Sequence, residues 1–333
     1  MKEIKFNWEE GINEISKEIK KYKKIGLQIP EGLRTLASEI VERIEEYGPD
    51  VFLWGEPTYG ACDLADGPFA DIKIEALIHM GHLPMPYHSD SYKIPVFFVP
   101  VRHSGNLELK KESIDKVKEI LSDKIGIVST AQHLHLIDSL KKELKKEGID
   151  AQTSEGGPRI AAAAQLLGCN SSVARKMKVD GFLYLGTGVF HPLTVALSTG
   201  KPVVNIDPHT AEVTVTNPDL FLRQRYAAIH AAYEAKRWAV MFSTQIGQKR
   251  MDLTEKLVES LKKRNCQVLT VGGIHQSPEQ LAGLNIEAAT ITSCPRTAIE
   301  DGPTWPMPLL TVPELQIILG KREKEPYPFD EFA

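Results

Sequence analysis

Apolar and polar segments alternate along this chain in a pattern that occurs three times. Each section opens with a short apolar segment, which predicts a buried β-strand, and continues through a polar turn into an amphipathic helix. The opening segments are Ile25–Ile29, Ile125–Val128 and Trp238–Phe242. Because their starts lie about one hundred residues apart, the period is that of a domain and not that of a solenoid repeat.

Further segments complete the same pattern in each section. In the first section the apolar residues after the turn recur at helical spacing; they are Leu33, Leu36, Ala37, Ile40, Val41 and Ile44. Additional strands are expected at Val51–Trp54, Gln267–Val271, Ala76–His79, Phe182–Leu185 and Ala289–Thr292, and after Pro95, Pro202 and Pro308. Short strands that alternate with helices favour parallel sheets covered on both faces. We therefore expect an α/β protein of three homologous small domains with mainly parallel four-stranded sheets.

The expected domains are residues 1–118, 119–210 and 211–333, and each carries one cysteine in a loop after a strand: Cys62, Cys169 and Cys294. Ligands of such sheets bind beyond the carboxyl ends of the strands, so we expect these three loop cysteines at the ligand-binding edges. The fourth cysteine, Cys266, lies at a helix-to-strand junction and is expected at the opposite edge.

Composition excludes several classes of protein. The 333 residues are 42% hydrophobic and 25% charged, with a formal net charge of −4, which gives no electrostatic signature for nucleic acid. Apolar runs stay well short of the ~20 residues that a membrane span requires. The first 24 residues are rich in Lys and Glu and lack a hydrophobic core region, so we expect no signal peptide and a cytoplasmic, reducing environment.

Two interpretations of the loop cysteines remain open from the residues alone. Cysteines are often inert small hydrophobic residues of a core, and this interpretation is preferred for Cys266. The loop cysteines instead have polar or turn-forming neighbours, and closely spaced Cys pairs, which a structural zinc site normally shows, are absent from the sequence. Three widely separated thiolates fit a [4Fe–4S] cluster with one iron left open.

The motifs around the loop cysteines resemble those of one enzyme family. Tyr59–Asp66 followed by Leu77–His82 resembles the first cysteine region of the diphthamide biosynthesis enzymes. Leu167–Asn170 with Leu185–His191 is similar to the second region, and Ser293–Arg296 with Ile299–Asp301 is similar to the third. The matches follow the order of the family and cover nearly the whole chain, in the single-chain form that resembles the archaeal enzymes.

The resemblance implies a pseudo-threefold arrangement of the domains around a central [4Fe–4S] cluster that Cys62, Cys169 and Cys294 hold. It also implies a homodimer that binds S-adenosylmethionine at the open iron. A radical mechanism would transfer the 3-amino-3-carboxypropyl group to the imidazole C2 of one histidine on translation elongation factor 2, the first step of diphthamide biosynthesis. The electron donor is not identified by the sequence.

Polar turns at strand ends are the candidate contacts for S-adenosylmethionine. The first is the turn with Ser243, Thr244, Gln245, Gly247 and Gln248, which we expect at a helix N-terminus, where Ser243 and Thr244 have the alternative role of N-caps. Weaker candidates are Pro30, Glu31 and Gly32, and the turn Gly186, Thr187 and Gly188. Candidate catalytic or substrate-contacting residues are His79, His82, His191 and Arg296.

Two other functions are compatible with the pattern. A quinolinate-synthase-like iron–sulfur dehydratase resembles this architecture and would use its cluster as a Lewis acid. A three-domain ligand-binding protein that is not an enzyme would bury its thiols and hold no cluster. The flanking motifs match the diphthamide enzymes better than either alternative.

Overall fold

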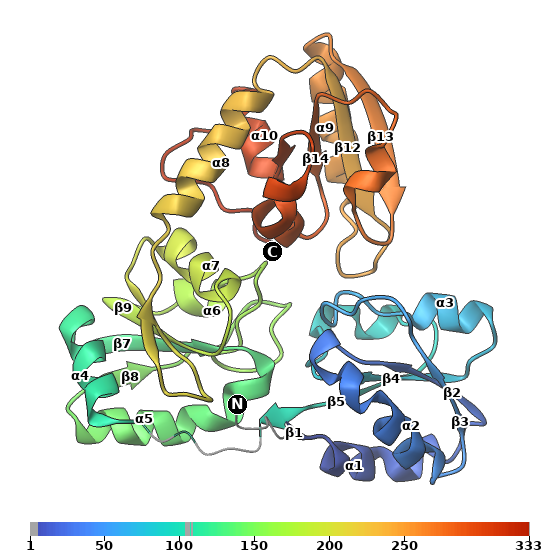
Figure 1. Ribbon diagram of the computed structural model, residues 1–333, viewed down its shortest axis with the longest axis vertical. Helices are drawn as coiled ribbons and strands as arrows, with labels where there is room; N and C mark the ends of the chain where they lie inside the picture. The colour runs from blue at the N-terminus through green and yellow to red at the C-terminus, as the bar shows by residue number, and fades with distance from the viewer. Residues whose placement is uncertain (1–5, 104–106, 108, 333) are drawn as a thin grey trace. The chain divides into compact units, whose positions relative to one another are not determined.

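The computed structural model describes residues 6–103, 107 and 109–332 and contains three separate, mainly parallel sheets (Figure 1). The chain forms two compact units. The first is built from the described residues within Met1–Leu166, together with Ser172–Thr187 and Val204–Thr214. The second is built from Leu167–Ser171, Gly188–Val203 and the described residues within Val215–Ala333. The predicted domains, 1–118, 119–210 and 211–333, stay a prediction.

The first sheet has the strand order β3-β2-β4-β5. Its strands are β2 (Lys24–Gln28), β3 (Asp50–Leu53), β4 (Ala76–Met80) and β5 (Val96–Val99), and its helices are α1 (Glu9–Ile19), α2 (Ala37–Glu45) and α3 (Asp66–Asp71). Alternate residues of a strand face opposite sides, so α1 and α2 pack on one face and α3 on the other. Two short strands that flank this sheet in the sequence, β1 (Phe6–Asn7) and β6 (Arg102–His103), pair with each other in antiparallel orientation.

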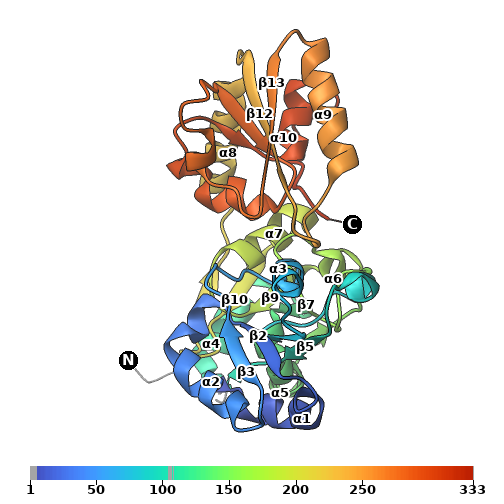
Figure 2. The same cartoon turned by 90° about the vertical axis from the view of Figure 1, so that its right-hand side faces the viewer.

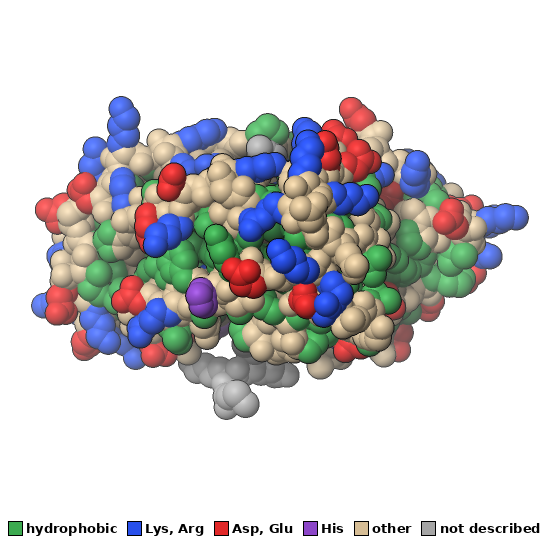
Figure 3. All heavy atoms as spheres, turned by 90° about the horizontal axis from the view of Figure 1, so that it is seen from above, with side chains coloured by type: hydrophobic (Ala, Val, Ile, Leu, Met, Phe, Trp, Pro, Cys, Tyr) green, Lys and Arg blue, Asp and Glu red, His purple; other side chains and the backbone are tan. Residues whose placement is uncertain are grey.

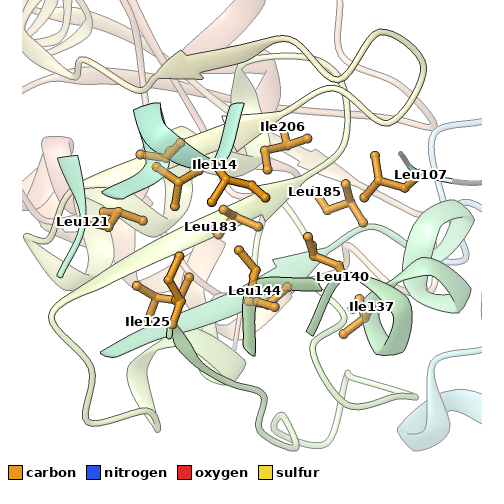
Figure 4. Packing of buried hydrophobic residues seen from close by; sticks show 14 of the residues in the cluster. Leu107, Ile114, Leu121, Ile125, Ile137, Leu140, Leu144, Leu183, Leu185 and Ile206 are labelled. Carbon is orange, nitrogen blue, oxygen red and sulfur yellow. The ribbon is translucent and has the colours of Figure 1, made fainter. Parts of the chain in front are cut away.

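The second sheet has five strands in the order β11-β10-β9-β7-β8. They are β7 (Lys124–Ser129), β8 (Asp150–Gln152), β9 (Gly181–Leu185), β10 (Val203–Ile206) and β11 (Val213–Val215), with helices α4 (Lys111–Ile120), α5 (Ile137–Lys146) and α6 (Ser172–Arg175). Figure 4 shows its core, in which Ile114 of α4 and Leu140 and Leu144 of α5 pack against Ile125 and Leu183 of the strands.

The third sheet has the order β13-β12-β14-β15. Its strands are β12 (Arg237–Ser243), β13 (Gln267–Gly273), β14 (Ala288–Ile291) and β15 (Leu309–Leu310). The second unit also contains α7 (Phe190–Thr199), α8 (Asp219–Ala232), α9 (Met251–Lys263) and α10 (Val312–Ile318). Residues of α8, α9 and α10 form one buried cluster with Trp238 and Val240, whereas Ala239 and Met241 face a second cluster on the other side of the sheet. These three helices and the strands β12 and β13 are labelled in Figure 2.

The three sheets share one strand order, in which the second strand of each section lies outside the first and the third and fourth follow on the other side. The prediction of a repeated α/β pattern with mainly parallel sheets is thereby confirmed. The second sheet differs from the expected four strands because Val213–Val215 adds a fifth strand beside β10. Two of the opening strands carry a glycine because an aromatic ring packs against it: Phe69 against Gly26 in β2 and Phe182 against Gly126 in β7.

The surface carries mixed charge. On the face drawn in Figure 3, Lys and Arg side chains alternate with Asp and Glu, in keeping with the small net charge of −4. Within residues 6–103, 107 and 109–332, helices that combine the length and the apolar character of a membrane crossing are not found.

Candidate metal centre and surrounding site

The loop cysteines follow the carboxyl ends of parallel strands, as the sequence predicts. Cys62 comes after β3, Cys169 lies between β8 and β9, and Cys294 comes directly after β14. All three are half-buried. Cys62 belongs to the first unit, and Cys169 and Cys294 belong to the second.

The Cys62 loop is a tight turn that is hydrogen-bonded to the side chain of Gln28, the last residue of β2. The Asp63 N–H donates to the Gly60 carbonyl at 3.0 Å and closes the turn around Ala61 and Cys62. The Gln28 side chain bonds this loop twice: Nε2 donates to the Asp63 carbonyl at 2.6 Å, and Oε1 accepts the Ala65 N–H at 3.2 Å. Since Gln28 is fully buried, these bonds fix the position of the Cys62 loop relative to strand β2.

The Cys169 loop is a second tight turn, closed by reciprocal bonds between Leu167 and Asn170. The Asn170 N–H donates to the Leu167 carbonyl at 3.0 Å, and the Leu167 N–H donates back at 3.3 Å. The Thr194 hydroxyl of α7 donates to the Gly168 carbonyl at 3.1 Å. A Cβ atom at Gly168 would lie 2.1 Å from Cε1 of Phe190, so only glycine fits there.

The Cys294 loop continues β14 and is held from the start of α9. The Arg250 Nε donates to the Thr292 carbonyl at 2.6 Å, and its Nη2 donates to the Ser293 carbonyl at 3.3 Å. The Cys294 N–H donates to Oε1 of Gln248 at 3.4 Å. One guanidinium thereby fixes two consecutive backbone carbonyls, those of Thr292 and Ser293, between the end of β14 and Cys294.

Cys266 occupies a different environment, as predicted. It precedes β13, at the amino end of the third sheet. Its Sγ lies 3.8 Å from the Ala235 carbonyl oxygen, and its side chain packs beside the apolar cluster of the third sheet. This position suits a small apolar residue.

His79 and His82 form a hydrogen-bonded pair beside the Cys62 loop. The Gln28 Oε1, which accepts from Ala65, also contacts Nδ1 of His79 at 3.1 Å, so the His79 proton is assigned to Nδ1. Nε2 of His79 then accepts the Nδ1–H of His82 at 2.9 Å, so that in the neutral form of His82 the lone pair is on Nε2. Burial, and to a smaller extent the neighbouring His82, hold the pKa of His79 well below its usual range, so His79 is neutral at pH 7.

His191 and Arg296 lie near each other within the second unit. Burial, and then the positive charge of Arg296, lower the pKa of His191 to about 4. Arg296 also forms an ion pair with Glu300, one turn further along the chain. At neutral pH the pair therefore combines the neutral imidazole of His191 with the cation of Arg296, which lies two residues beyond Cys294 in the sequence.

The sequence predicts the turn Ser243–Gln248 at a helix N-terminus, and the structure differs on this point. The helix α9 begins at Met251, so the turn does not form the helix N-terminus, and the N-cap alternative for Ser243 and Thr244 is wrong. The Ser243 hydroxyl is buried, donates to the Ile274 carbonyl at 2.8 Å and accepts the Gln245 N–H at 3.1 Å. Its observed role is to shape the turn, whereas Gln248 reaches the Cys294 loop.

The other two candidate turns also lie at carboxyl ends of strands. After β2, Pro30 directly precedes a 3-10 helix (Glu31–Leu36), Gly32 is exposed and Glu31 pairs with Arg34 at 2.9 Å. After β9, a Cβ at Gly186 would lie 2.5 Å from the Tyr184 hydroxyl oxygen, and the Tyr184 hydroxyl donates to the Thr187 carbonyl at 3.1 Å. Gly188 has φ 79°, a left-handed conformation that favours glycine.

Sequence reasoning missed the residues that hold the cysteine loops. Gln28 and Arg250 carry the bonds described above, yet a glutamine inside a strand and an arginine before a helix look ordinary in the sequence. The Gln28 signal was its polar character in an otherwise apolar strand. Within the described parts of the chain, groups of three or more His, Cys, Asp or Glu side chains arranged for a metal ion are not found, so the convergence of the loop cysteines stays a prediction.

The fold is an α/β fold with repeated parallel sheets, and each sheet has one half-buried cysteine at its carboxyl edge. These features place the chain in the class of candidate metalloenzymes. Comparison with known proteins narrows that class. The family described as "Putative diphthamide synthesis protein" matches residues 29–328. The chain therefore belongs to the diphthamide synthesis family.

Relatives and a solved structure agree with this assignment. The chain is 39% identical over 324 residues to the 2-(3-amino-3-carboxypropyl)histidine synthase of Pyrococcus horikoshii, covering 96% of this chain and 92% of that protein. It is 28% identical to subunit 1 of the Homo sapiens synthase, covering 93% and 72%. The crystal structure of Dph2 from Pyrococcus horikoshii with a 4Fe-4S cluster superposes with a TM-score of 0.88 at 38% identity, covering 96% and 93%. The chain is accordingly an enzyme of diphthamide synthesis, a transferase.

Proposed function

We propose that this enzyme transfers the 3-amino-3-carboxypropyl group of S-adenosylmethionine to the imidazole C2 of a histidine on translation elongation factor 2. The relative from Pyrococcus horikoshii carries the name of that synthase, and its Dph2 structure contains a 4Fe-4S cluster. The observation that carries the proposal in this chain is the shared position of the loop cysteines at carboxyl strand edges, apart from Cys266 at the opposite edge.

The donor set fits a [4Fe–4S] cluster held by Cys62, Cys169 and Cys294. Thiolates are the ligands that iron–sulfur clusters prefer, and three of them leave one iron open for a substrate. Each cysteine lies in a turn whose backbone is bonded to a polar side chain, and these side chains are fully buried for Gln28 and Thr194 and largely buried for Arg250, so contacts within the polypeptide shape each loop. The rival quinolinate-synthase-like function gains no support from the relatives.

When bound, the cluster would supply the electron that cleaves the bond from sulfur to the γ-carbon of S-adenosylmethionine. The whole transfer balances without an external oxidant: this C–S bond breaks, a C–C bond to imidazole C2 forms, and methylthioadenosine and the C2 proton leave. The protein must therefore hold the methionine moiety and accept one proton.

We assign the proton acceptor to His82. Its Nδ1–H is used toward His79, so its Nε2 carries the lone pair that a base requires. The neutral His79 and the buried Gln28 hold the ring in this tautomer, and the same Gln28 bonds the Cys62 loop. Arg296 and the neutral His191 are assigned to the substrate carboxylate, because a cation beside Cys294 favours a negative group.

The contacts of S-adenosylmethionine extend this proposal. The turns with Ser243, Thr244, Gln245, Gly247 and Gln248, with Pro30, Glu31 and Gly32, and with Gly186, Thr187 and Gly188 lie at carboxyl ends of strands, where such sheets bind ligands. An electron donor that the sequence does not identify, a homodimer and a cytoplasmic location complete the proposal.

The test is transfer of radiolabel from carboxyl-labelled S-adenosylmethionine to elongation factor 2 under anaerobic, reducing conditions. We expect label on the factor and an equal amount of methylthioadenosine. Release of 5′-deoxyadenosine instead would refute the cleavage at the γ-carbon. A protein that binds no iron or sulfide after reconstitution would refute the cluster.

A further inference from the structure

The segment Asp330–Phe332, which we call the strap, is bonded to the Cys169 loop within the second unit. The Phe332 N–H donates to the Cys169 carbonyl at 2.8 Å, and the Asn170 side-chain amide donates to the Phe332 carbonyl at 2.7 Å. Glu331 accepts both the N–H of Ser171, at 2.9 Å, and the Ser171 hydroxyl. Three consecutive residues of the Cys169 loop are therefore bonded to the strap.

Arg250 connects the strap to the Cys294 loop. Its Nη1 and Nη2 donate to the two carboxylate oxygens of Asp330 at 2.9 Å each, a bidentate pair. The same guanidinium donates to the carbonyls of Thr292 and Ser293, directly before Cys294. Its carbon lies 4.0 Å from the centre of the Phe332 ring, so the strap covers one face of the guanidinium.

The environment and geometry of the Arg250–Asp330 pair favour a strong interaction. The Asp330 side chain is 4% exposed and that of Arg250 is 17% exposed, so water screens the pair little. Bidentate, charge-assisted bonds fix direction as well as distance, because the planar guanidinium matches the carboxylate. Two loops far apart in sequence are thereby bonded to one short segment. The strap itself lies beyond residue 328, where the family match ends.

We propose that the strap and Arg250 are positioning residues, which set the Cys169 loop and the Cys294 loop relative to each other before a cluster binds. The purpose of this arrangement rests on the proposed function, since two thiolates of one cluster must be held at a definite separation. The mechanical claim is independent of the cluster, because every contact that supports it lies within the polypeptide.

A second arginine–carboxylate pair provides a matched control. At the amino end of the third sheet, Arg237 forms an ion pair with Glu287 at 2.7 Å. Glu287 also accepts the backbone N–H groups of Lys236 and Arg237 at 2.7 and 2.9 Å. This pair ties the sheet at the edge that holds Cys266, away from the loop cysteines. Removal of the Glu287 charge therefore tests whether a general destabilisation of this sheet changes the alkylation rates of the cysteines.

The experiment measures alkylation of each cysteine by N-ethylmaleimide in the cluster-free protein, resolved by mass spectrometry. Asp330→Asn and Arg250→Lys are expected to raise the rates at Cys169 and Cys294 by about tenfold, because loss of bidentate bonds increases local opening. The rates at Cys62 and Cys266 should stay at their wild-type values. Glu287→Gln should leave the rates at Cys169 and Cys294 unchanged.

Two outcomes would overturn the proposal: rates at Cys169 and Cys294 that do not change in Asp330→Asn, or rates that rise equally at all four cysteines, as general unfolding would cause. Amide hydrogen exchange of the same proteins checks the result, since protection should fall in residues 168–172 and 292–296 alone. Cluster reconstitution separates the two hypotheses. A protein that takes up no cluster but shows the predicted alkylation pattern refutes the proposed function and leaves the strap in place.

Discussion

Replacement of Gly168 by Ala tests how closely the Cys169 loop is packed on α7. A Cβ atom at this position would lie 2.1 Å from Cε1 and 2.5 Å from Cδ1 of Phe190. Carbon atoms prefer a separation of about 3.5–4.0 Å, so the loop or the ring must move by about 1.5 Å. Phe190 cannot yield freely, because it is buried in a cluster with Phe221, Ile299 and Tyr327.

The expected loss of stability follows from this clash. Overpacking of a well-filled core destabilises by about 1–3 kcal/mol, and the short distance places Gly168→Ala at about 2–3 kcal/mol. Urea unfolding of the cluster-free protein, followed by tryptophan fluorescence, measures this change as a lower midpoint. Since Cys169 follows the substituted residue directly, cluster uptake should fall as well.

Two further variants separate packing from other causes. Gly67→Ala in α3, where a Cβ would meet no atom within 4 Å, should not destabilise the protein and should stabilise it by up to about 1 kcal/mol, because alanine restricts the unfolded chain. Phe190→Leu removes the ring edge, so the double variant should be more stable than the sum of the single effects by about 1 kcal/mol or more. A Gly168→Ala protein as stable as wild type, or strict additivity in the double variant, would refute the reasoning.

Three other predictions concern the site. Alanine at any loop cysteine should lower the iron and sulfide content of the reconstituted protein, whereas Cys266→Ala should not; equal content in all four variants contradicts the ligand assignment. His82→Gln should reduce transfer to elongation factor 2 by about 10²-fold or more while methylthioadenosine is still released, and a parallel loss of both would argue against a role as base. The lowered pKa of His191, about 4, means that the unfolded chain binds more protons below pH ~6.5, so stability present above that pH is lost as the pH falls toward 4. By pH 5 this loss is at most about 2 kcal/mol, and urea unfolding of His191→Gln should lack it; an unchanged pH dependence would show that other groups cause it.

Much of the fold follows from local patterns in the sequence. The predicted segment Ile125–Val128 lies within β7, and Phe182–Leu185 lies within β9, because short apolar runs between polar turns have few alternatives to a buried strand. The fifth strand, Val213–Val215, escaped prediction because three residues with mixed polarity carry almost no periodic signal. The edge on which each cysteine lies was predictable, since it depends only on whether the cysteine precedes or follows its strand.

The supporting contacts of the site were not predictable in the same way. The bond from Ala65 to Gln28 spans 37 residues, the pair of Arg250 with Asp330 spans 80, and the bond from Asn170 to Phe332 spans 162. No local pattern encodes such pairs, because a hydrogen bond between distant residues depends on how the intervening elements pack. The tautomer of the histidine pair has the same origin, since it follows from the orientation of one buried amide.

The sequence by itself therefore determined the three strand-and-helix sections, the placement of three cysteines after strands and one before, and the family resemblance of their motifs. Periodicity and turn chemistry are local, and a parallel strand places whatever follows it at one edge of its sheet. Only the tertiary structure decided which side chains hold each cysteine loop: Gln28 for Cys62, Thr194 for Cys169 and Arg250 for Cys294. Those choices require the chain to be folded, because buried polar groups take the partners that packing brings within reach.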